Sequence, residues 1–161
     1  MKHTLLLLIL SLVLVTGKSQ ELSKGSEIPR AVFYKTDGKA FSTDLVGKSK
    51  KSLIMFFDAT CGHCQKVAAE LSKRNKELAT IELYLVTHDE LTSINYFMTK
   101  YAKPLSAMKN VTVLQDKDHV FLPLFHPKQY PALYLYGSDR KLIFWSSNDK
   151  DLQKFFSLIK R

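Results

Sequence analysis

The sequence predicts one α/β domain in which helices flank a central mixed β-sheet on both faces. Two observations support this fold class. Short apolar or alternating runs, typical of strands, are separated by longer segments in which apolar residues recur at helical spacing. Near the carboxyl end, two strand-like runs follow each other across a short turn and precede a last amphipathic segment. A chain of 161 residues is long enough for one such domain with its own hydrophobic core.

The amino-terminal residues 1–19 have the pattern of a signal peptide. Lys2 supplies a positive charge, residues 5–15 are apolar apart from one serine, and small residues lead up to Ser19. This apolar run is shorter than the roughly 20 residues that a transmembrane helix needs. We therefore expect cleavage after residue 19, which leaves residues 20–161 as an exported domain, periplasmic or otherwise extracytoplasmic, without stable insertion in a membrane. The alternatives are a cut after Gly17 and an uncleaved membrane anchor.

The first strands of the domain are predicted to form an amino-terminal β-hairpin. Residues 31–35 and 40–42 have the composition of strands, and Asp37 and Gly38 supply the bend between them. Residues 53–57 form a continuous apolar run. Such a run suits a central strand that is buried on both faces of a sheet.

Helices and strands then alternate. Residues 65–78 show helical spacing, and residues 81–87 alternate as in a strand. The next helix starts at residue 89 and must end before Pro104, because the residue before a proline disfavours helical geometry. We assign the apolar stripe of this helix to the core; it consists of Leu91, Ile94, Phe97, Met98 and Tyr101.

The last third of the chain is predicted to complete the sheet. Residues 111–114 suit a short strand, and Pro123 keeps the segment that follows from forming a long regular helix. Residues 132–136 and 141–145 are predicted to pair as a hairpin across a turn that contains glycine. A final helix begins near residue 148, and its apolar face consists of Leu152, Phe155, Phe156 and Ile159.

The two cysteines of the chain, Cys61 and Cys64, lie between the predicted central strand and the helix that follows it. Two thiols at this spacing can form and break a disulfide with each other. Such a bridge closes a very small loop, and the stabilisation from a disulfide grows with loop length. An extracytoplasmic compartment also permits disulfides. The pair therefore predicts a redox site rather than a structural crosslink.

The formal net charge of +9 comes from lysine and arginine clusters beside a predicted strand and on a predicted helix. Lysines in such places are usually solvated, and an exported protein rarely meets nucleic acid. We therefore expect no nucleic-acid partner. The charge supports only a general attraction to anionic envelope surfaces or acidic proteins. We expect a monomer.

With these features the chain resembles the thioredoxin superfamily, and within it the exported TlpA/ResA-type thiol-disulfide oxidoreductases. The resemblance depends on the apolar strand before Cys61-Gly62-His63-Cys64, on Tyr130-Pro131 before a hairpin, and on the amphipathic last helix. It extends over about residues 26–161 and implies a thioredoxin-like fold for residues 20–161.

The resemblance implies a role for each residue of the motif. Cys61 would be the nucleophile, because the amino end of a helix favours a thiolate, and Cys64 would be the resolving thiol. Gly62 leaves a partner's backbone unobstructed, and His63 can stabilise the thiolate. A Gly-His pair is similar to that of protein disulfide isomerase, which implies a more oxidising site than that of thioredoxin.

The same resemblance predicts a substrate-binding surface beside the cysteines. Pro131 is similar to the family's cis-proline, which faces the disulfide, and Tyr130 precedes it. Thr60 lies directly before the nucleophile and is expected to contact a partner as well. The implied partners are protein disulfide or dithiol substrates and a redox protein that resets the site. No cofactor is expected, because the dithiol itself carries two electrons.

Three positions depart from the family pattern. Thr60 stands where most relatives have tryptophan, Met55 occupies the position of thioredoxin's buried aspartate, and Val67 replaces an acid that some relatives carry. The usual proton acceptor for Cys64 is thus absent, and the sequence does not identify another.

One alternative is a metal site, for zinc or for copper delivery. A structural zinc site usually has two ligand pairs of defined spacing, and copper chaperones of the same superfold separate their cysteines by three residues. We therefore expect no metal. The ligands in question would be Cys61, Cys64, His63, His88, His119 and His126.

Two further alternatives are a peroxidase of the peroxiredoxin type and a binding module with a vestigial dithiol. The peroxidase pattern Pro-X-X-X-Thr-X-X-Cys is not matched, because Thr60 adjoins Cys61. The unusual residues Met55, Thr60 and Val67 would suit a binding module, which stays an alternative to the thiol-disulfide exchange that we expect.

Overall fold

The computed structural model describes residues 22–161, and the predicted signal peptide lies outside these residues. In the described part, seven strands form one sheet. They are β1 (Val32–Lys35), β2 (Ala40–Ser42), β3 (Ser52–Phe56), β4 (Glu82–Thr87), β5 (Val111–Gln115), β6 (Ala132–Tyr136) and β7 (Leu142–Ser146). The strand order is β2-β1-β5-β4-β3-β6-β7. Because β3, β4 and β5 are parallel while the outer pairs are antiparallel, the sheet is mixed, as the sequence predicted.

The long helices lie in the predicted segments. The helices are α1 (Gly62–Lys73), α2 (Asn75–Leu78), α3 (Leu91–Tyr101), α4 (Lys103–Ser106), α5 (Phe121–Phe125) and α6 (Leu152–Ile159), with 3₁₀ turns η1 (Thr43–Leu45) and η2 (Asp149–Asp151). The short helix α4 was not predicted. The helix predicted at 65–78 starts earlier, at Gly62, and is divided at Arg74. The Arg74 N–H reaches the carbonyls of Glu70, Leu71 and Ser72, a tightened last turn that ends α1.

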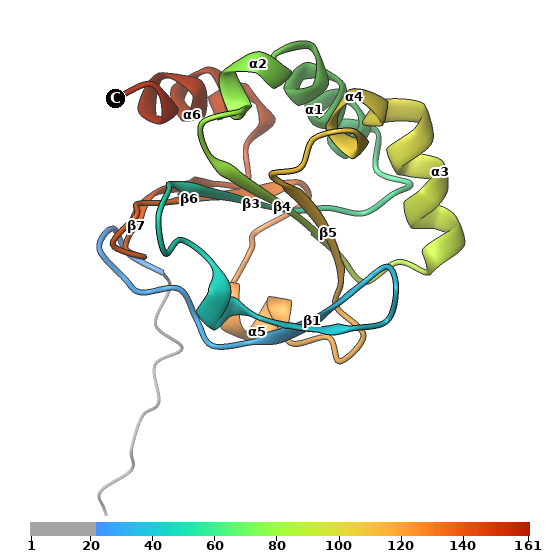
Figure 1. The fold of residues 1–161 in the computed structure, drawn as a ribbon, viewed down its shortest axis with the longest axis horizontal. Coiled ribbons are helices and arrows are strands. Elements are labelled where there is room, and N and C mark those ends of the chain that lie inside the picture. Colours follow the sequence, from blue (N-terminus) through green and yellow to red (C-terminus); the bar gives the residue numbers. More distant parts are fainter. Residues whose placement is uncertain (1–21) are drawn as a thin grey trace, which may run out of the picture.

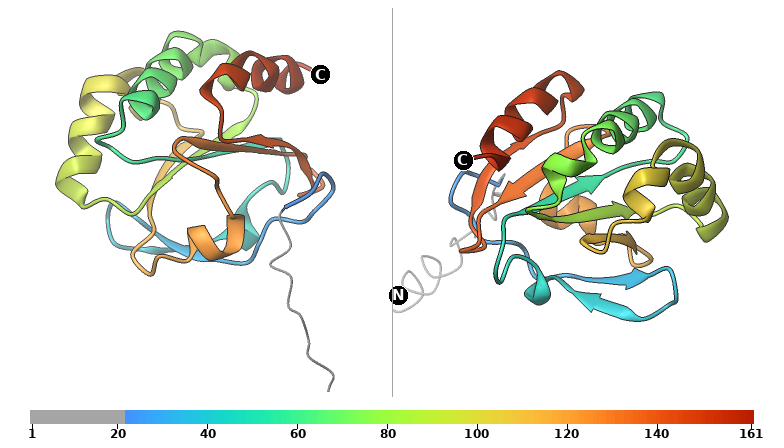
Figure 2. Two further views of the ribbon diagram at one scale, coloured as in Figure 1. Left: turned by 180° about the vertical axis from the view of Figure 1, so that it is seen from behind. Right: turned by 45° about the horizontal axis from the view of Figure 1, so that its top comes forward.

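The two faces of the sheet are covered differently. Figure 1 shows α1, α2, α3, α4 and α6 on one face and α5 on the other. The sheet curls at the β1–β2 end, so that this hairpin returns toward α5, as the left view in Figure 2 also shows. Phe41 of β2 lies 5.5 Å from Tyr84 of β4, measured between ring centroids. The predicted cover on both faces is confirmed, with the long helices gathered on one side.

The central strand β3 is buried along its whole length, as predicted from its apolar run. Leu53 and Met55 face the core beneath α1, α3 and α6. Ile54 and Phe56 face the second core, beneath α5 and the β1–β2 hairpin. This alternation follows from the strand geometry, in which successive side chains point to opposite faces.

An aromatic column fills the second core. The Phe121 ring stacks on Phe56 and on Phe125, with 4.1 Å between centroids and 9° between ring planes in both pairs. Tyr134 of β6 meets the ring of Phe121 nearly edge-on at 5.8 Å. Because Phe56 is the last residue of β3, this column supports the loop that carries the cysteines.

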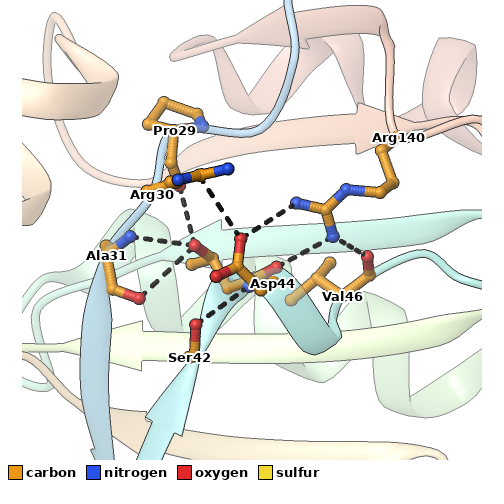
Figure 3. Close-up of polar contacts among 8 residues, drawn as sticks. Pro29, Arg30, Ala31, Ser42, Asp44, Val46 and Arg140 are labelled. Carbon is orange, nitrogen blue, oxygen red and sulfur yellow. Dashed lines mark hydrogen bonds and ion pairs between the residues drawn. The ribbon is translucent and has the colours of Figure 1, made fainter.

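A polar cluster joins the first 3₁₀ turn to the β6–β7 turn (Figure 3). The Arg140 guanidinium donates to the carbonyls of Thr43 and Val46 and lies 4.0 Å from the Asp44 carboxylate. The Thr43 hydroxyl accepts a hydrogen bond from the Ala31 N–H at 2.9 Å. Thr43 is buried, so these contacts satisfy polar groups that water does not reach. Arg140 therefore links the amino-terminal segment to the far edge of the sheet.

Candidate redox-active site

Cys61 and Cys64 lie at the start of α1, directly beyond the carboxyl end of β3. Cys61 is the residue before the first turn of the helix and is partly exposed, whereas Cys64 is inside that turn and fully buried. Both are free thiols in this structure. The first N–H groups of a helix have no partner within it, so they favour negative charge at Cys61. The accessible sulfur is thus the one that the helix end favours as a thiolate.

Asp58 fixes the turn that presents Cys61. Its Oδ1 accepts hydrogen bonds from the Thr60 N–H at 2.7 Å, the Thr60 hydroxyl at 2.6 Å and the Cys61 N–H at 3.1 Å. Partial burial favours the protonated acid, but these bonds and the nearby His88 outweigh burial and lower the pKa of Asp58. Asp58 is therefore a carboxylate at neutral pH.

Cys64 is chemically different from its partner. Burial raises the pKa of the Cys64 thiol, and the neighbouring Cys61 and the Asp58 carboxylate also act in this direction. A backbone hydrogen bond from Asp58 acts in the opposite direction but does not compensate. Cys64 is thus a protonated thiol at neutral pH, and it must lose its proton before it can attack a disulfide.

The loop before β6 forms a wall beside Cys61. The Tyr130-Pro131 peptide bond is cis, in agreement with the resemblance. The Tyr130 carbonyl lies 4.0 Å from the Cys61 sulfur, and the Tyr130 ring lies 5.1 Å from that of Phe56. A hollow of about 120 Å³ opens here; its lining consists of His63, Gln129, Tyr130, Pro131, Ser147 and Asp149. The structure thus brings the predicted His63, Tyr130 and Pro131 together.

His63 is held by a residue far away in the sequence. Its Nδ1 lies 2.7 Å from the Asp149 carboxylate, at the start of the 3₁₀ turn before α6. The hydrogen bond with His63 lowers the pKa of Asp149. The pair couples the second residue of the motif to the carboxyl-terminal helix and fixes one ring nitrogen of the imidazole.

Thr60, also predicted as a partner contact, lies at a different hollow. This depression holds about 500 Å³, and its lining consists of Ala59, Thr60, Gln65, Thr92, Ser93, Tyr96 and Tyr101. It lies between the start of α1 and α3. Thr60 is exposed there, while its hydroxyl is engaged with Asp58. Gly62 has open space around its Cα, in keeping with an unobstructed approach to Cys61.

Sequence reasoning missed a group of ionisable residues beside the cysteines. The ligand atoms of Asp58, His88 and Asp89 all lie within 4.8 Å of one another, and the Tyr130 hydroxyl lies 3.3 Å from His88 Nδ1. These residues follow β3 and β4, two neighbouring parallel strands whose carboxyl ends meet at one edge of the sheet. The sequence did contain a signal for this group, because polar residues follow each of the two apolar strands.

This group also bears on the metal site that the sequence left as an alternative. Among residues 22–161, Asp58, His88 and Asp89 are the three potential ligands that lie close enough together to bind one ion. Neither cysteine belongs to this group. The structure therefore does not bring the two cysteines together with His63, His119 or His126 as a ligand set.

The fold and the site together define a class. A mixed sheet with a dithiol at the start of the helix after its central strand, faced by a cis-proline loop, is the architecture of a thioredoxin-like protein. The chain belongs to the AhpC/TSA family, which it matches over residues 25–144. No curated protein sequence matches the chain.

Solved structures resemble the chain along most of its length. The thioredoxin domain of a thiol-disulfide oxidoreductase from Bacteroides vulgatus has a TM-score of 0.64 at 19% identity, covering 86% of this chain and 99% of that one. A secreted disulfide oxidoreductase of Mycobacterium tuberculosis, homologous to E. coli DsbE, has 0.62 at 20% identity, covering 80% and 95%. Peroxidoxin BcpB of the same organism has 0.66 at 14% identity, covering 87% and 97%. At such identities the likeness concerns the fold.

Proposed function

We propose that the chain is an exported thiol-disulfide oxidoreductase of the TlpA/ResA type, which exchanges disulfides with envelope proteins through Cys61 and Cys64. The observation that carries the proposal is the asymmetry of the two sulfurs. Cys61 is accessible at the start of a helix, whereas Cys64 is buried and its pKa is raised. This asymmetry supports one sulfur as the attacking group and the other as the resolving group.

Exchange then proceeds in two displacements. The Cys61 thiolate attacks a substrate disulfide, the substrate S–S bond breaks, and one substrate thiolate leaves and takes a proton from solvent. Cys64, once deprotonated, attacks the Cys61 sulfur in the mixed disulfide and releases the second substrate thiolate. The substrate gains two electrons and the protein becomes the Cys61–Cys64 disulfide. The reverse sequence oxidises a substrate dithiol.

Export is supported by the signal pattern in residues 1–19 and by the likeness to a protein described as secreted. In the described part of the chain, no helix has the length and apolar character needed to cross a bilayer. The proposed location is the periplasm or another extracytoplasmic compartment, where disulfides persist.

The proposed redox poise is closer to that of protein disulfide isomerase than to that of thioredoxin. Reduction potentials of about −180 mV for the isomerase and about −270 mV for thioredoxin differ by roughly 4 kcal/mol for two electrons. The Gly62-His63 pair of the motif supports this position, and Asp149 holds the His63 imidazole at one ring nitrogen.

The proposed partners are proteins with disulfides or dithiols and a redox protein that resets the site. The two hollows beside the motif, one at Pro131 and one at Thr60, offer room for segments of an extended substrate. No organic cofactor, metal or nucleic acid takes part in this proposal, and the protein acts as a monomer.

Peroxide reduction is the second candidate, because two structural neighbours are described as a peroxidoxin and a peroxiredoxin-like protein. In the peroxidase pattern a threonine stands three residues before the cysteine, and here that position is Asp58. Its carboxylate is committed to Thr60 and Cys61. A carboxylate beside the attacking thiolate opposes the approach of electron-rich peroxide oxygen, so we favour disulfide exchange.

Insulin-disulfide reduction tests the proposal. Wild type should reduce insulin in the presence of dithiothreitol, and Cys61→Ser should not. Cys64→Ser should instead accumulate mixed disulfides at Cys61 with envelope proteins, which identifies the substrates. Absence of wild-type turnover, with an intact fold, would favour the binding module. Stoichiometric copper or zinc in the reduced protein would favour metal delivery.

A further inference from the structure

The carboxyl ends of β3 and β4 place an ionisable network directly beside the dithiol. Asp58 comes from the loop after β3, and His88 and Asp89 come from the segment between β4 and α3. Tyr130, from the loop before β6, adds its hydroxyl at 3.3 Å from His88 Nδ1. Burial and the carboxylates of Asp58 and Asp89 raise the pKa of Tyr130, which keeps this hydroxyl protonated.

The two carboxylates of the network have different roles. Asp89 Oδ2 accepts hydrogen bonds from the Ala59 N–H at 2.8 Å and the Thr87 hydroxyl at 2.6 Å, so it fixes the two loops against each other. Asp58 uses Oδ1 for all its hydrogen bonds within the described residues. Its second oxygen is therefore available to take a proton.

Asp58 is also the acidic residue that acts on the buried thiol. Its Oδ1 accepts from the Cys61 N–H at 3.1 Å, directly before the first turn of α1 that holds Cys64, and, besides burial, its negative charge raises the pKa of the Cys64 thiol. Met55, the second-last residue of β3, lies on the face that the long helices cover, and it cannot accept a proton. The resolving step nevertheless needs Cys64 to lose one.

We propose that Asp58 accepts the Cys64 proton in the resolving step and that His88 transfers it to solvent. This inference rests on the proposed disulfide exchange. The S–H bond of Cys64 breaks, its sulfur forms the bond to Cys61 Sγ, and the bond from Cys61 to the substrate sulfur breaks. The substrate leaves as a thiolate, and the proton moves to Asp58 and then to His88, which is partly exposed.

The mixed disulfide is the state in which this transfer is easiest. In the free reduced protein, the Cys61 thiolate disfavours a second negative charge on Cys64. Once Cys61 is bonded to the substrate it carries no charge, so that opposition disappears. The groups facing Asp58 are then Cys64 from α1 and His88 and Asp89 from the β4–α3 segment.

The test is a stopped-flow reaction of the reduced protein with 5,5′-dithiobis(2-nitrobenzoate). Attack by Cys61 releases one coloured thiolate, and attack by Cys64 on the mixed disulfide releases a second, so the two steps are separate phases. Asp58→Asn should slow the second phase at least about tenfold at pH 7, because general bases typically contribute about 10²–10⁴-fold. The first phase should stay within about threefold of wild type, since the asparagine oxygen can still accept from Thr60 and Cys61.

The matched control is Glu90→Gln. Glu90 follows Asp89 directly, is exposed, and makes no capping bond at the start of α3. The Glu90→Gln variant loses one negative charge at the same edge of the sheet, as Asp58→Asn does. Both phases of its reaction should stay within about twofold of wild type. In Asp58→Asn the second phase should also recover as the pH rises, because hydroxide replaces the missing base.

Three results separate the possible failures. Equal slowing of both phases, or an unchanged second phase, in a folded Asp58→Asn protein overturns the role of Asp58. An unchanged second phase in His88→Gln overturns the transfer to His88, for which we expect at least threefold slowing. A wild-type protein without a first phase would contradict the proposed function itself, and Cys64→Ser should show the first phase alone.

Discussion

Replacement of Phe121 by alanine tests the packing of the second core. The Phe121 side chain is fully buried and stacks on Phe56 and Phe125 on its two sides. Complete burial of a phenylalanine contributes about 1.5–3 kcal/mol, and each favourable aromatic pair adds about 0.5–1.5 kcal/mol. The substitution should therefore lower the free energy of unfolding by about 3–5 kcal/mol, the usual range for Phe→Ala in a core.

Urea unfolding followed by circular dichroism measures this cost, and thermal unfolding should show a Tm lowered by about 10–15 °C. Leu122→Ala is the matched control, since Leu122 lies on the same short helix but is 47% exposed. Its cost should stay below about 1 kcal/mol. Similar costs for the two variants would refute the assignment of α5 to the face of the sheet opposite the long helices.

Three further substitutions test other parts of the structure. Asp116→Ala should lower the free energy of unfolding by about 2–4 kcal/mol in urea titrations, because the buried carboxylate accepts two N–H bonds at the start of α5 that would then lack a partner; a cost similar to that of Asp116→Asn would contradict this. Arg140→Met should cost about 1.5–3 kcal/mol and loosen the amino-terminal segment in hydrogen exchange, because the carbonyls that accept from the guanidinium lose a charged donor; unchanged exchange there would contradict the link. Hydrogen bonds from Arg74 and Lys160 lower the pKa of Glu77 to about 2, so the stabilisation from this carboxylate is complete above pH 4.5 and is lost as the pH falls toward 2; Glu77→Gln should flatten that part of the acid-unfolding curve, and an unaltered curve would contradict it.

The sequence predicted the elements whose signals are local. Residues 53–57 are apolar without interruption, which predicts a central strand, and the structure shows β3 buried at every position. The last helix likewise shows its apolar spacing in the sequence, and Leu152, Phe155, Phe156 and Ile159 are buried. Pro123 lies in α5, which has only five residues. A short helix is expected there, because proline lacks the N–H that a longer helix would need.

Features that depend on distant partners could not be predicted. α1 ends at Arg74, whose guanidinium donates to Glu77 and Gln153 and lies over the Phe156 ring. Two of these partners, Gln153 and Phe156, are far away in the sequence. Periodicity alone continues through that point. The long helices gather on one face because of the order of β3, β4 and β5 in the sheet. This order cannot be inferred from the pattern of residues.

The candidate site was predicted in part for the same reason. Cys61 and Cys64 are adjacent to a strand signal, so they could be found from the sequence. Asp149 is 86 positions from His63, and the network of Asp58 and His88 forms because two parallel strands end side by side. Each of these residues is ordinary when read alone, and only the register of the sheet brings them to the dithiol.

A redox titration tests the central claim most directly. The purified protein would be equilibrated in glutathione buffers, its free thiols alkylated, and the modified forms counted by mass spectrometry. The account predicts one two-electron transition between a dithiol and the Cys61–Cys64 disulfide, with a midpoint closer to about −180 mV than to about −270 mV. Cysteines that stay reduced in every buffer would contradict redox function, and a midpoint below about −260 mV would contradict the oxidising poise.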